Sequence, residues 1–279
     1  LTPHSSPLTA MSFILIEKPR PHVTQIILNR PERMNAMAFD VMVPLREALE
    51  EVSFDNDCRV VVLTGAGKGF CSGADLVNPG FLPIFEGLTM PGISRRALKV
   101  LDDVILALRD MHQPVIGAIN GPAIGGGFCL AMACDIRLAA DTAYFRPAGI
   151  NNGLTAAELG LSFTLPRAIG SSRAFEIMLS GRDVDAQEAD RIGLVSRVLP
   201  PEQLLDACYD LAERIIGFSH IGVELTKQML WSSLEAGSMH AHMNHEGQAQ
   251  LFVRMTTRNF EEAIRARKEK RKPKFDDSL

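Results

Sequence analysis

Two glycine-rich segments contain the first residues in the chain whose types and spacing suggest chemistry. The segment FCSGAD at 70–75 follows the apolar run RVVVLTG at 59–65, and AIGGG at 123–127 follows PVIGAI at 114–119. Glycine lets backbone approach a ligand closely. If the two apolar runs are equivalent strands, each segment can direct one main-chain N–H at a shared carbonyl oxygen and so stabilise an oxyanion. The alternative is that the glycines only form tight turns.

A single carboxylate, that of Glu158, is the candidate acid or base. It lies in the segment GLTAAELGLSFTLPR, three residues after Thr155. A carboxylate can act as a general base when a substrate proton lies within hydrogen-bonding reach. The pattern T-x-x-E is also that of a helix capping box, which requires no function. Both interpretations of Glu158 remain open at this point.

The elements that must position these residues alternate between strand and helix. SFILIEK and HVTQIILNR, joined by a Pro-Arg-Pro turn, predict a hairpin, and apolar residues at helical spacing predict helices over 39–52 and 94–111. The short apolar runs at 59–65 and 114–119 are typical of strands buried on both faces, and DIRLAA at 135–140 predicts a third strand. This alternation predicts an α/β core with the site at the carboxyl ends of the strands.

The chain divides into three parts. Residues 1–11 lack the basic and apolar regions of a signal peptide, and we expect a disordered leader there. Residues 12–200 form the predicted α/β core that contains the site. Residues 201–279 form a helical region, with helices expected at 201–217, 219–236, 239–256 and 258–271, which covers a ligand or a partner subunit.

Composition excludes several classes of protein. The net charge of −4 and the pI of about 6.0 argue against nucleic acid as the main partner. Pro114 to Cys134 is uncharged, but its prolines and glycines indicate a strand, a loop and a buried helix, not a bilayer span. The five cysteines are odd in number and scattered. They fit neither a disulfide framework nor a zinc site, so we expect a reducing compartment, the cytoplasm.

Three further features have competing interpretations. The basic C-terminal run is either a local phosphate site or a solvated helix face, and comprises Arg265, Arg267, Lys268, Lys270, Arg271, Lys272 and Lys274. Cys129 is either a nucleophile near a helix start or a small buried residue, and the latter is favoured. His240, His242 and His245 could suggest a metal site, but His240 and His242 fall on different helix faces.

Five segments together resemble the crotonase superfamily, the enoyl-CoA hydratases and isomerases, and in particular actinobacterial enoyl-CoA hydratase paralogues. They are LNRPERMNAM, VVLTGAGKGFCSGADL, QPVIGAINGPAIGGGFCLAMACDIRLAA, GLVSRV and KRKPKF, and the resemblance covers residues 12–275. It implies a spiral core of ββα units and a C-terminal helical trimerisation region. It also implies a homotrimer or a hexamer made of two trimers, and a CoA thioester substrate of fatty-acid metabolism. No metal and no cofactor other than the CoA of the substrate are implied.

The resemblance also assigns roles to residues of this chain. The amides of Ala74 and Gly126 would hold the thioester oxygen, and Asp75 is expected to cap or brace the loop that carries Ala74. The positions implied to lie along the CoA moiety are Met34, Ala36, Phe70, Ser72, Ala74, Asp75, Leu76 and Gly126.

The same resemblance distinguishes possible reactions. Hydratases of this family carry glutamates at the positions occupied here by Cys129 and Gly149, so the usual two-glutamate hydration lacks both of its acids. Isomerases that move a double bond from the 3- to the 2-position carry a single glutamate, matched here by Glu158, with Pro166 and Arg167 following. Isomerisation with Glu158 as base is therefore favoured. Hydration or other crotonase chemistry by a rearranged site, and acyl-CoA binding without turnover, remain alternatives.

Overall fold

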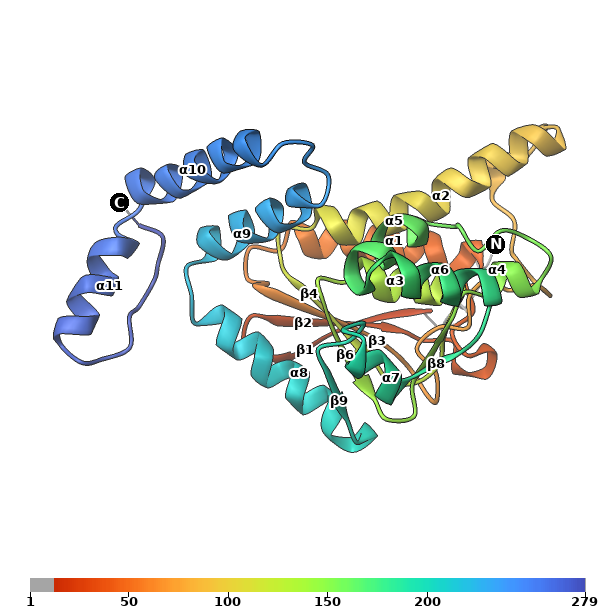
Figure 1. The fold of residues 1–279 in the computed structure, drawn as a ribbon, viewed down its shortest axis with the longest axis horizontal. Helices are drawn as coiled ribbons and strands as arrows, with labels where there is room; N and C mark the ends of the chain where they lie inside the picture. Colours follow the sequence, from red (N-terminus) through yellow and green to blue (C-terminus); the bar gives the residue numbers. More distant parts are fainter. Residues whose placement is uncertain (1–12, 279) are drawn as a thin grey trace, which may run out of the picture.

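The computed structural model describes residues 13–278, and Figure 1 shows their arrangement. The leader predicted at 1–11 lies outside the described residues. A six-stranded sheet forms the centre, in the order β1 (Ile14–Arg20), β2 (Val23–Leu28), β3 (Val60–Gly65), β4 (Val115–Ile119), β6 (Ile136–Ala140) and β9 (Arg197–Leu199). The strands β1 and β2 form the predicted antiparallel hairpin, and every other neighbouring pair is parallel.

A smaller sheet stands beside the carboxyl ends of the central strands. It contains β5 (Ala123–Ile124), β7 (Tyr144–Arg146) and β8 (Val184–Asp185), with β7 in the middle. The strand β5 belongs to the glycine-rich segment 123–127, so this sheet holds that segment in place. The three strands have only two or three residues each, too few to leave a periodic signal in the sequence.

Helices cover both faces of the central sheet. On one face α8 (Pro201–Ile216) packs on Val60 and Val62. On the other, α1 (Phe39–Ser53), α2 (Met90–Asp110) and α3 (Gly126–Ala133) pack on Val61 and Leu63. Successive side chains of a strand point to opposite faces, so covering both faces requires the uninterrupted apolar run of β3.

The remaining helices complete the molecule. Along the chain, between β7 and β9, come α4 (Ala148–Asn151), α5 (Leu161–Ile169), α6 (Ser171–Ser180) and α7 (Ala186–Arg191). After α8 come α9 (His220–Ser233), α10 (Met239–Thr256) and α11 (Asn259–Lys268), which confirm the helical C-terminal region. Figure 1 shows α10 and α11 extending away from the sheet, and α10 has no buried residue.

One helix boundary was predicted wrongly. The helix expected from Ser94 begins at Met90, as α2. Pro91 lies in its first turn, where the missing N–H of proline costs no hydrogen bond, so Pro91 and Gly92 belong to the helix. The uncharged stretch from Pro114 to Cys134 forms β4, β5 and α3, as predicted. Within residues 13–278, no helix combines the length and apolar character needed to cross a membrane.

Candidate active site

The carboxyl ends of β3 and β4 are tied together by one side chain. Asn120, directly after β4, accepts a hydrogen bond from the Gly65 amide at 3.2 Å and donates one to the Gly67 carbonyl at 3.1 Å. The two glycine-rich segments therefore begin at a common edge of the sheet, as the α/β prediction required.

Backbone contacts then join the two segments. The amides of Phe70 and Cys71 both donate to the Pro122 carbonyl at 3.1 Å, and the Ile124 amide donates to Cys71 at 2.9 Å. Further along, a Cβ added at Gly73 would lie 3.3 Å from the Gly126 nitrogen. Glycine at 73, with a φ of 81°, is what permits this approach.

The Ala74 amide is free to bind a ligand. The Met37 amide donates a hydrogen bond to the Gly73 carbonyl at 2.7 Å, and the Met37 carbonyl accepts one from the Asp75 amide at 3.0 Å. Backbone groups of successive extended residues point to opposite sides, so the N–H of Ala74, between those two, points away from Met37. Ala74 is exposed, and no acceptor for its amide occurs in the described chain.

The Gly126 amide is the second free donor. Gly126 is the first residue of α3, and the first amides of a helix have no partner within it. Gly125 before it has φ 52° and ψ −120° and donates to the Arg146 carbonyl at 2.8 Å. That conformation belongs to glycine. The positive end of the α3 dipole adds to the attraction for negative charge.

The Glu158 carboxylate lies beside this pair of amides. A Cβ added at Gly125 would be 3.5 Å from Oε1 of Glu158. The side chain is half-buried, and within residues 13–278 its carboxylate has no hydrogen-bond or ion-pair partner. Burial raises the pKa of Glu158 above the ordinary glutamate value. An unpaired, desolvated carboxylate next to two free amides has the environment of a general base.

The capping-box interpretation of Glu158 is wrong. The following helix, α5, begins at Leu161 and its N-cap is Gly160, so neither Thr155 nor Glu158 caps a helix. The Thr155 hydroxyl donates to the Ala157 carbonyl at 3.1 Å instead. Leu159, at φ 45°, and Gly160, at φ 78°, are both left-handed. Left-handed backbone is uncommon for leucine, and this turn orients Glu158 before α5 starts.

Cys129 and Gly149, where the family resemblance implies the two hydratase glutamates, cannot supply acids. Cys129 is 1% exposed, and burial raises the pKa of its thiol well above the ordinary value, which excludes a thiolate nucleophile near neutral pH. Its Sγ donates to the Glu158 carbonyl at 3.5 Å. At Gly149, an added Cβ would overlap the carbonyl oxygen of Thr155.

Asp75 braces the loop that carries Ala74. Its side chain is 1% exposed and forms ion pairs with Arg33 at 2.7 Å and Arg30 at 3.1 Å. Oδ1 also accepts from the amides of Val77 and Asn78. The hydrogen bond from Arg33 and those from the two amides hold the pKa of Asp75 well below its ordinary value. With its oxygens occupied in this way, Asp75 fixes the loop.

The other positions predicted to contact CoA differ in exposure. Met34 is 38% exposed and Leu76 is 77% exposed, and Ser72 is half-buried. The side chains of Ala36 and Phe70 are buried, at 6% and 0%, so Phe70 packs in the core and offers a ligand only its backbone.

Sequence reasoning missed two residues that build the site. Asn35 is fully buried with φ 56°, and its amide nitrogen donates to the carbonyls of Ala66, Gly69 and Phe70. Met37 lies between the two oxyanion segments, because a Cβ at Gly126 would overlap its Sδ. Both belong to the segment LNRPERMNAM, whose resemblance to the family was the only signal for them.

The remaining candidates lie outside the site. No group of histidines, cysteines and acids in the described residues could hold a metal ion. All five cysteines are buried free thiols. In the basic C-terminal run, Arg265 and Arg271 pair with Glu262 at 2.5 Å, whereas Arg267, Lys268, Lys270 and Lys272 are exposed.

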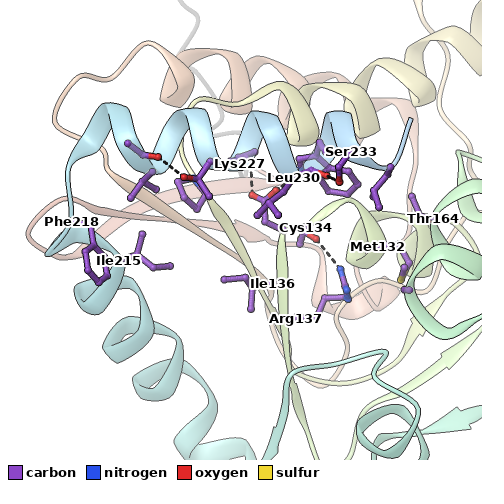
Figure 2. A pocket seen from close by; sticks show the side chains of 18 of the residues that line it. Met132, Cys134, Ile136, Arg137, Thr164, Ile215, Phe218, Lys227, Leu230 and Ser233 are labelled. Carbon is purple, nitrogen blue, oxygen red and sulfur yellow. Dashed lines mark hydrogen bonds and ion pairs between the residues drawn. The ribbon is translucent and has the colours of Figure 1, made fainter. Parts of the chain in front are cut away.

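Two cavities bear on function. One of about 430 Å³ adjoins the site and is lined by Cys129 and Leu159 among others. A larger apolar groove of about 820 Å³ lies between α9, α8 and α5. Figure 2 shows Ile215, Phe218 and Leu230 around it. None of the site residues Ala74, Gly126 and Glu158 lines either cavity.

Comparisons with known proteins identify the family of the chain. Residues 20–278 match the enoyl-CoA hydratase/isomerase family. The "Probable enoyl-CoA hydratase EchA12" of Mycobacterium tuberculosis (strain ATCC 25618 / H37Rv) is 66% identical over 269 residues, 96% of this chain and 94% of that protein.

Solved structures give the same result. The crystal structure of a probable enoyl-CoA hydratase/isomerase from Mycobacterium abscessus has a TM-score of 0.93 and 62% identity, covering 96% of this chain and all of that one. A structure described as a monofunctional enoyl CoA isomerase from M. smegmatis has a TM-score of 0.71 and 58% identity, covering 83% of this chain and 98% of that one. The fold is the crotonase fold, and the chain belongs to the enoyl-CoA hydratase/isomerase family.

Proposed function

We propose that this protein is an enoyl-CoA isomerase of fatty-acid metabolism that moves a double bond from the 3- to the 2-position of the acyl chain, with Glu158 as its single acid–base group. The observation that carries the proposal is the position of the Glu158 carboxylate, which is unpaired, half-buried and beside Gly125. Burial raises its pKa, which makes it a stronger base than an exposed glutamate.

The reaction needs only the groups that the site contains. The thioester oxygen accepts hydrogen bonds from the amides of Ala74 and Gly126. Glu158 removes a proton from the α-carbon, and the electrons form a dienolate whose negative oxygen is held by the two amides. Glu158, now a carboxylic acid, returns the proton to the γ-carbon, and the double bond ends between the α- and β-carbons.

Hydration is the less favoured reaction because it needs more acid–base groups than isomerisation does. Water must be held and deprotonated while the α-carbon receives a proton, which in the family takes two glutamates. Here Cys129 is a buried thiol and Gly149 has no room for a side chain. The printed names of the relatives include both hydratases and a monofunctional isomerase, so the reaction must be decided by assay.

Product analysis tests the proposal. Purified protein is incubated separately with a 3-enoyl-CoA, a 2-enoyl-CoA and a saturated acyl-CoA. We expect conversion of the 3-enoyl to the 2-enoyl thioester and little 3-hydroxyacyl-CoA from the 2-enoyl thioester. Hydration at a rate comparable with isomerisation would contradict the proposal, and binding without turnover of any of the three would assign the chain as a binder.

We also infer where the CoA moiety lies. Met34, Leu76 and the backbone around Ser72 offer it an exposed surface beside Ala74. The unpaired cations Arg267, Lys268, Lys270 and Lys272 offer a site for its phosphates. Figure 1 shows α11 extending away from the body of the molecule that contains α3, so these cations would act across a subunit boundary. Affinity for CoA should then weaken as salt rises.

A subunit boundary requires an oligomer, and we propose a homotrimer or a hexamer of two trimers. The helix α10 has no buried residue, and its apolar side chains are exposed, among them Met239, Leu251, Phe252 and Met255. The groove in Figure 2 adds a second exposed apolar surface along α9. Exposed apolar side chains that gather along whole helices are typical of a protein–protein interface. Light scattering during size-exclusion chromatography measures the number of subunits.

The five buried free thiols support a cytoplasmic location.

A further inference from the structure

Two neighbouring side chains, those of Glu158 and Leu159, converge on the start of α3. Oε1 of Glu158 would lie 3.5 Å from a Cβ added at Gly125, and Cδ1 of Leu159 would lie 3.5 Å from a Cβ added at Gly126. Gly125 and Gly126 follow one another in the chain, at the N-terminus of α3. The Leu159 side chain therefore stands next to the centre in which the proposed reaction moves its proton.

The same leucine also borders the cavity of about 430 Å³. Leu159 lines this cavity together with Cys129, whereas Gly126 and Glu158 do not line it. The Leu159 side chain is partly buried and packs against the main hydrophobic core. Because it touches the cavity on one side and approaches Gly126 on the other, it forms part of the wall between the cavity and the catalytic centre.

Water can enter this cavity at its rim. Asp102 and Glu235 line the cavity and are exposed, and their carboxylates give water molecules hydrogen-bond partners. Another part of the wall is apolar and buried, and is formed by Ile105, Cys129 and Ala133. Water is held where it finds several polar partners, so we expect it at the rim and not against the buried wall.

The backbone of Leu159 carries a conformational cost. Its φ of 45° lies in the left-handed region, which is uncommon for leucine and favours glycine. The next residue, Gly160, is also left-handed at φ 78°, and no atom of the described chain lies within 4 Å of a Cβ added there. Strained residues persist where the surroundings hold them, and they cluster at functional sites. A leucine kept at such a position points to a role of the side chain itself.

The proposed reaction needs a proton that stays on Glu158. Between its removal from the α-carbon and its return to the γ-carbon, the proton resides on the Glu158 carboxyl group. Water in contact with that group would exchange the proton with solvent, and excluding water prevents such leakage. The bound thioester covers the side of the two amides, which leaves the cavity side for the protein to close.

We propose that Leu159 excludes the water of this cavity from Glu158, so that the proton removed from the α-carbon is the one that returns to the γ-carbon. Leu159 acts on the reaction through Glu158 and is a positioning residue. A C–H bond breaks at the α-carbon as an O–H bond forms on Glu158, and that O–H bond breaks as a C–H bond forms at the γ-carbon. The inference rests on the proposed function.

Isomerisation in D₂O tests the inference on the wild type alone. A 3-enoyl-CoA with ordinary hydrogen is converted, and the γ-carbon of the 2-enoyl product is analysed for deuterium by mass spectrometry and NMR. The reaction is stopped at low conversion, so that repeated turnover adds no label. We expect most product molecules to carry no deuterium at the γ-carbon. Complete labelling would overturn the inference and leave the isomerase proposal intact, whereas absence of isomerisation would overturn both.

Variants assign the exclusion of water to the side chain. Leu159→Gly permits the same left-handed backbone and removes the side chain, and Leu159→Ala removes most of it, so both should label most of the product. Leu159→Met keeps the apolar volume and should give little label. The matched control is Leu106→Ala, which truncates a 48% exposed leucine of the same cavity and should label as the wild type does. Wild-type labelling by both Leu159→Gly and Leu159→Ala would overturn the assignment.

The pH profile gives a readout that a purely structural role of Leu159 would not change. Burial raises the pKa of Glu158, and water admitted beside the carboxylate reduces that desolvation. In Leu159→Gly, the pH at which kcat/KM reaches half of its plateau should move down, toward the ordinary glutamate value. Leu106→Ala should keep the wild-type midpoint. An unmoved midpoint in Leu159→Gly would show that no water has reached Glu158 and would overturn the inference.

Discussion

The Cys129 thiol donates a hydrogen bond to the backbone carbonyl of Glu158 at 3.5 Å. The same carbonyl accepts the Leu161 amide at 2.8 Å. The family resemblance implies a hydratase glutamate at position 129. Here residue 129 is instead a cysteine whose hydrogen bond holds the backbone of Glu158, the one candidate acid–base group. In the proposed mechanism, position 129 therefore acts on the chemistry through Glu158 and not directly.

The role of Cys129 can be tested with Cys129→Ser. Serine retains a donor for the Glu158 carbonyl, so we expect isomerase activity to stay within about tenfold of wild type. Iodoacetamide at neutral pH should label residue 129 slowly in the native protein, because burial raises its pKa and excludes the reagent. Fast labelling accompanied by complete loss of activity would identify a reactive nucleophile instead.

Glutamates introduced at 129 and 149 should not create a hydratase. A side chain at Gly149 would overlap the Thr155 carbonyl oxygen, so Gly149→Glu should cost about 1–3 kcal/mol or more. Denaturant unfolding measures that cost, and 2-enoyl-CoA hydration measures the gain. Gly237, which has open space around it and no left-handed φ, gives a control in Gly237→Ala. A stable double variant with strong hydratase activity would show that the backbone at 149 is not the obstacle.

Removing the Asp75 charge should loosen the loop that carries Ala74. Asp75→Asn leaves Arg30, whose side chain is 9% exposed, with only its longer ion pair to Glu32 at 3.9 Å. We expect the Tm to fall by about 2–8 °C, together with a weaker affinity for acyl-CoA. Because the folded-state pKa of Asp75 is lowered, its contribution to stability exists at neutral pH and is lost on acidification. The Tm difference between wild type and variant should therefore shrink as the pH falls, and a constant difference would contradict this role.

The raised pKa of Glu158 gives two pH dependences. The base is the ionised form, so kcat/KM should rise with pH through a pKa above the ordinary value of about 4.3 and then level off. The stability of the folded protein changes with pH in the opposite direction to the activity. A raised folded-state pKa favours the protonated native protein, so stability is lost as pH rises through it. Glu158→Gln should equal or exceed wild type in Tm at neutral pH, and a markedly lower Tm would indicate a structural carboxylate.

The sequence predicted the parts of the fold that leave a periodic or apolar signal. The run VVVL of β3 required cover on both faces, and the four C-terminal helices lie close to their predicted ranges. The segment from Ala143 to Val195 gave little signal, because β7 and β8 are too short to show alternation. Thr155 and Glu158 matched a capping pattern, but the left-handed Leu159 and Gly160 delay the helix to Leu161. The contact between Cys129 and Glu158 joins residues 29 positions apart, which no local pattern could reveal.

Steady-state turnover of a 3-enoyl-CoA by Glu158→Gln tests the central claim most directly. Glutamine keeps the size of the side chain and cannot accept the α-proton, so we predict a fall in kcat/KM of at least about 10²–10⁴-fold with no loss of Tm. Thr155→Ala is the control from the same loop, since its exposed hydroxyl bonds only to the Ala157 carbonyl, and it should retain activity. Wild-type turnover by Glu158→Gln would show that Glu158 is not the base and would contradict the proposed mechanism.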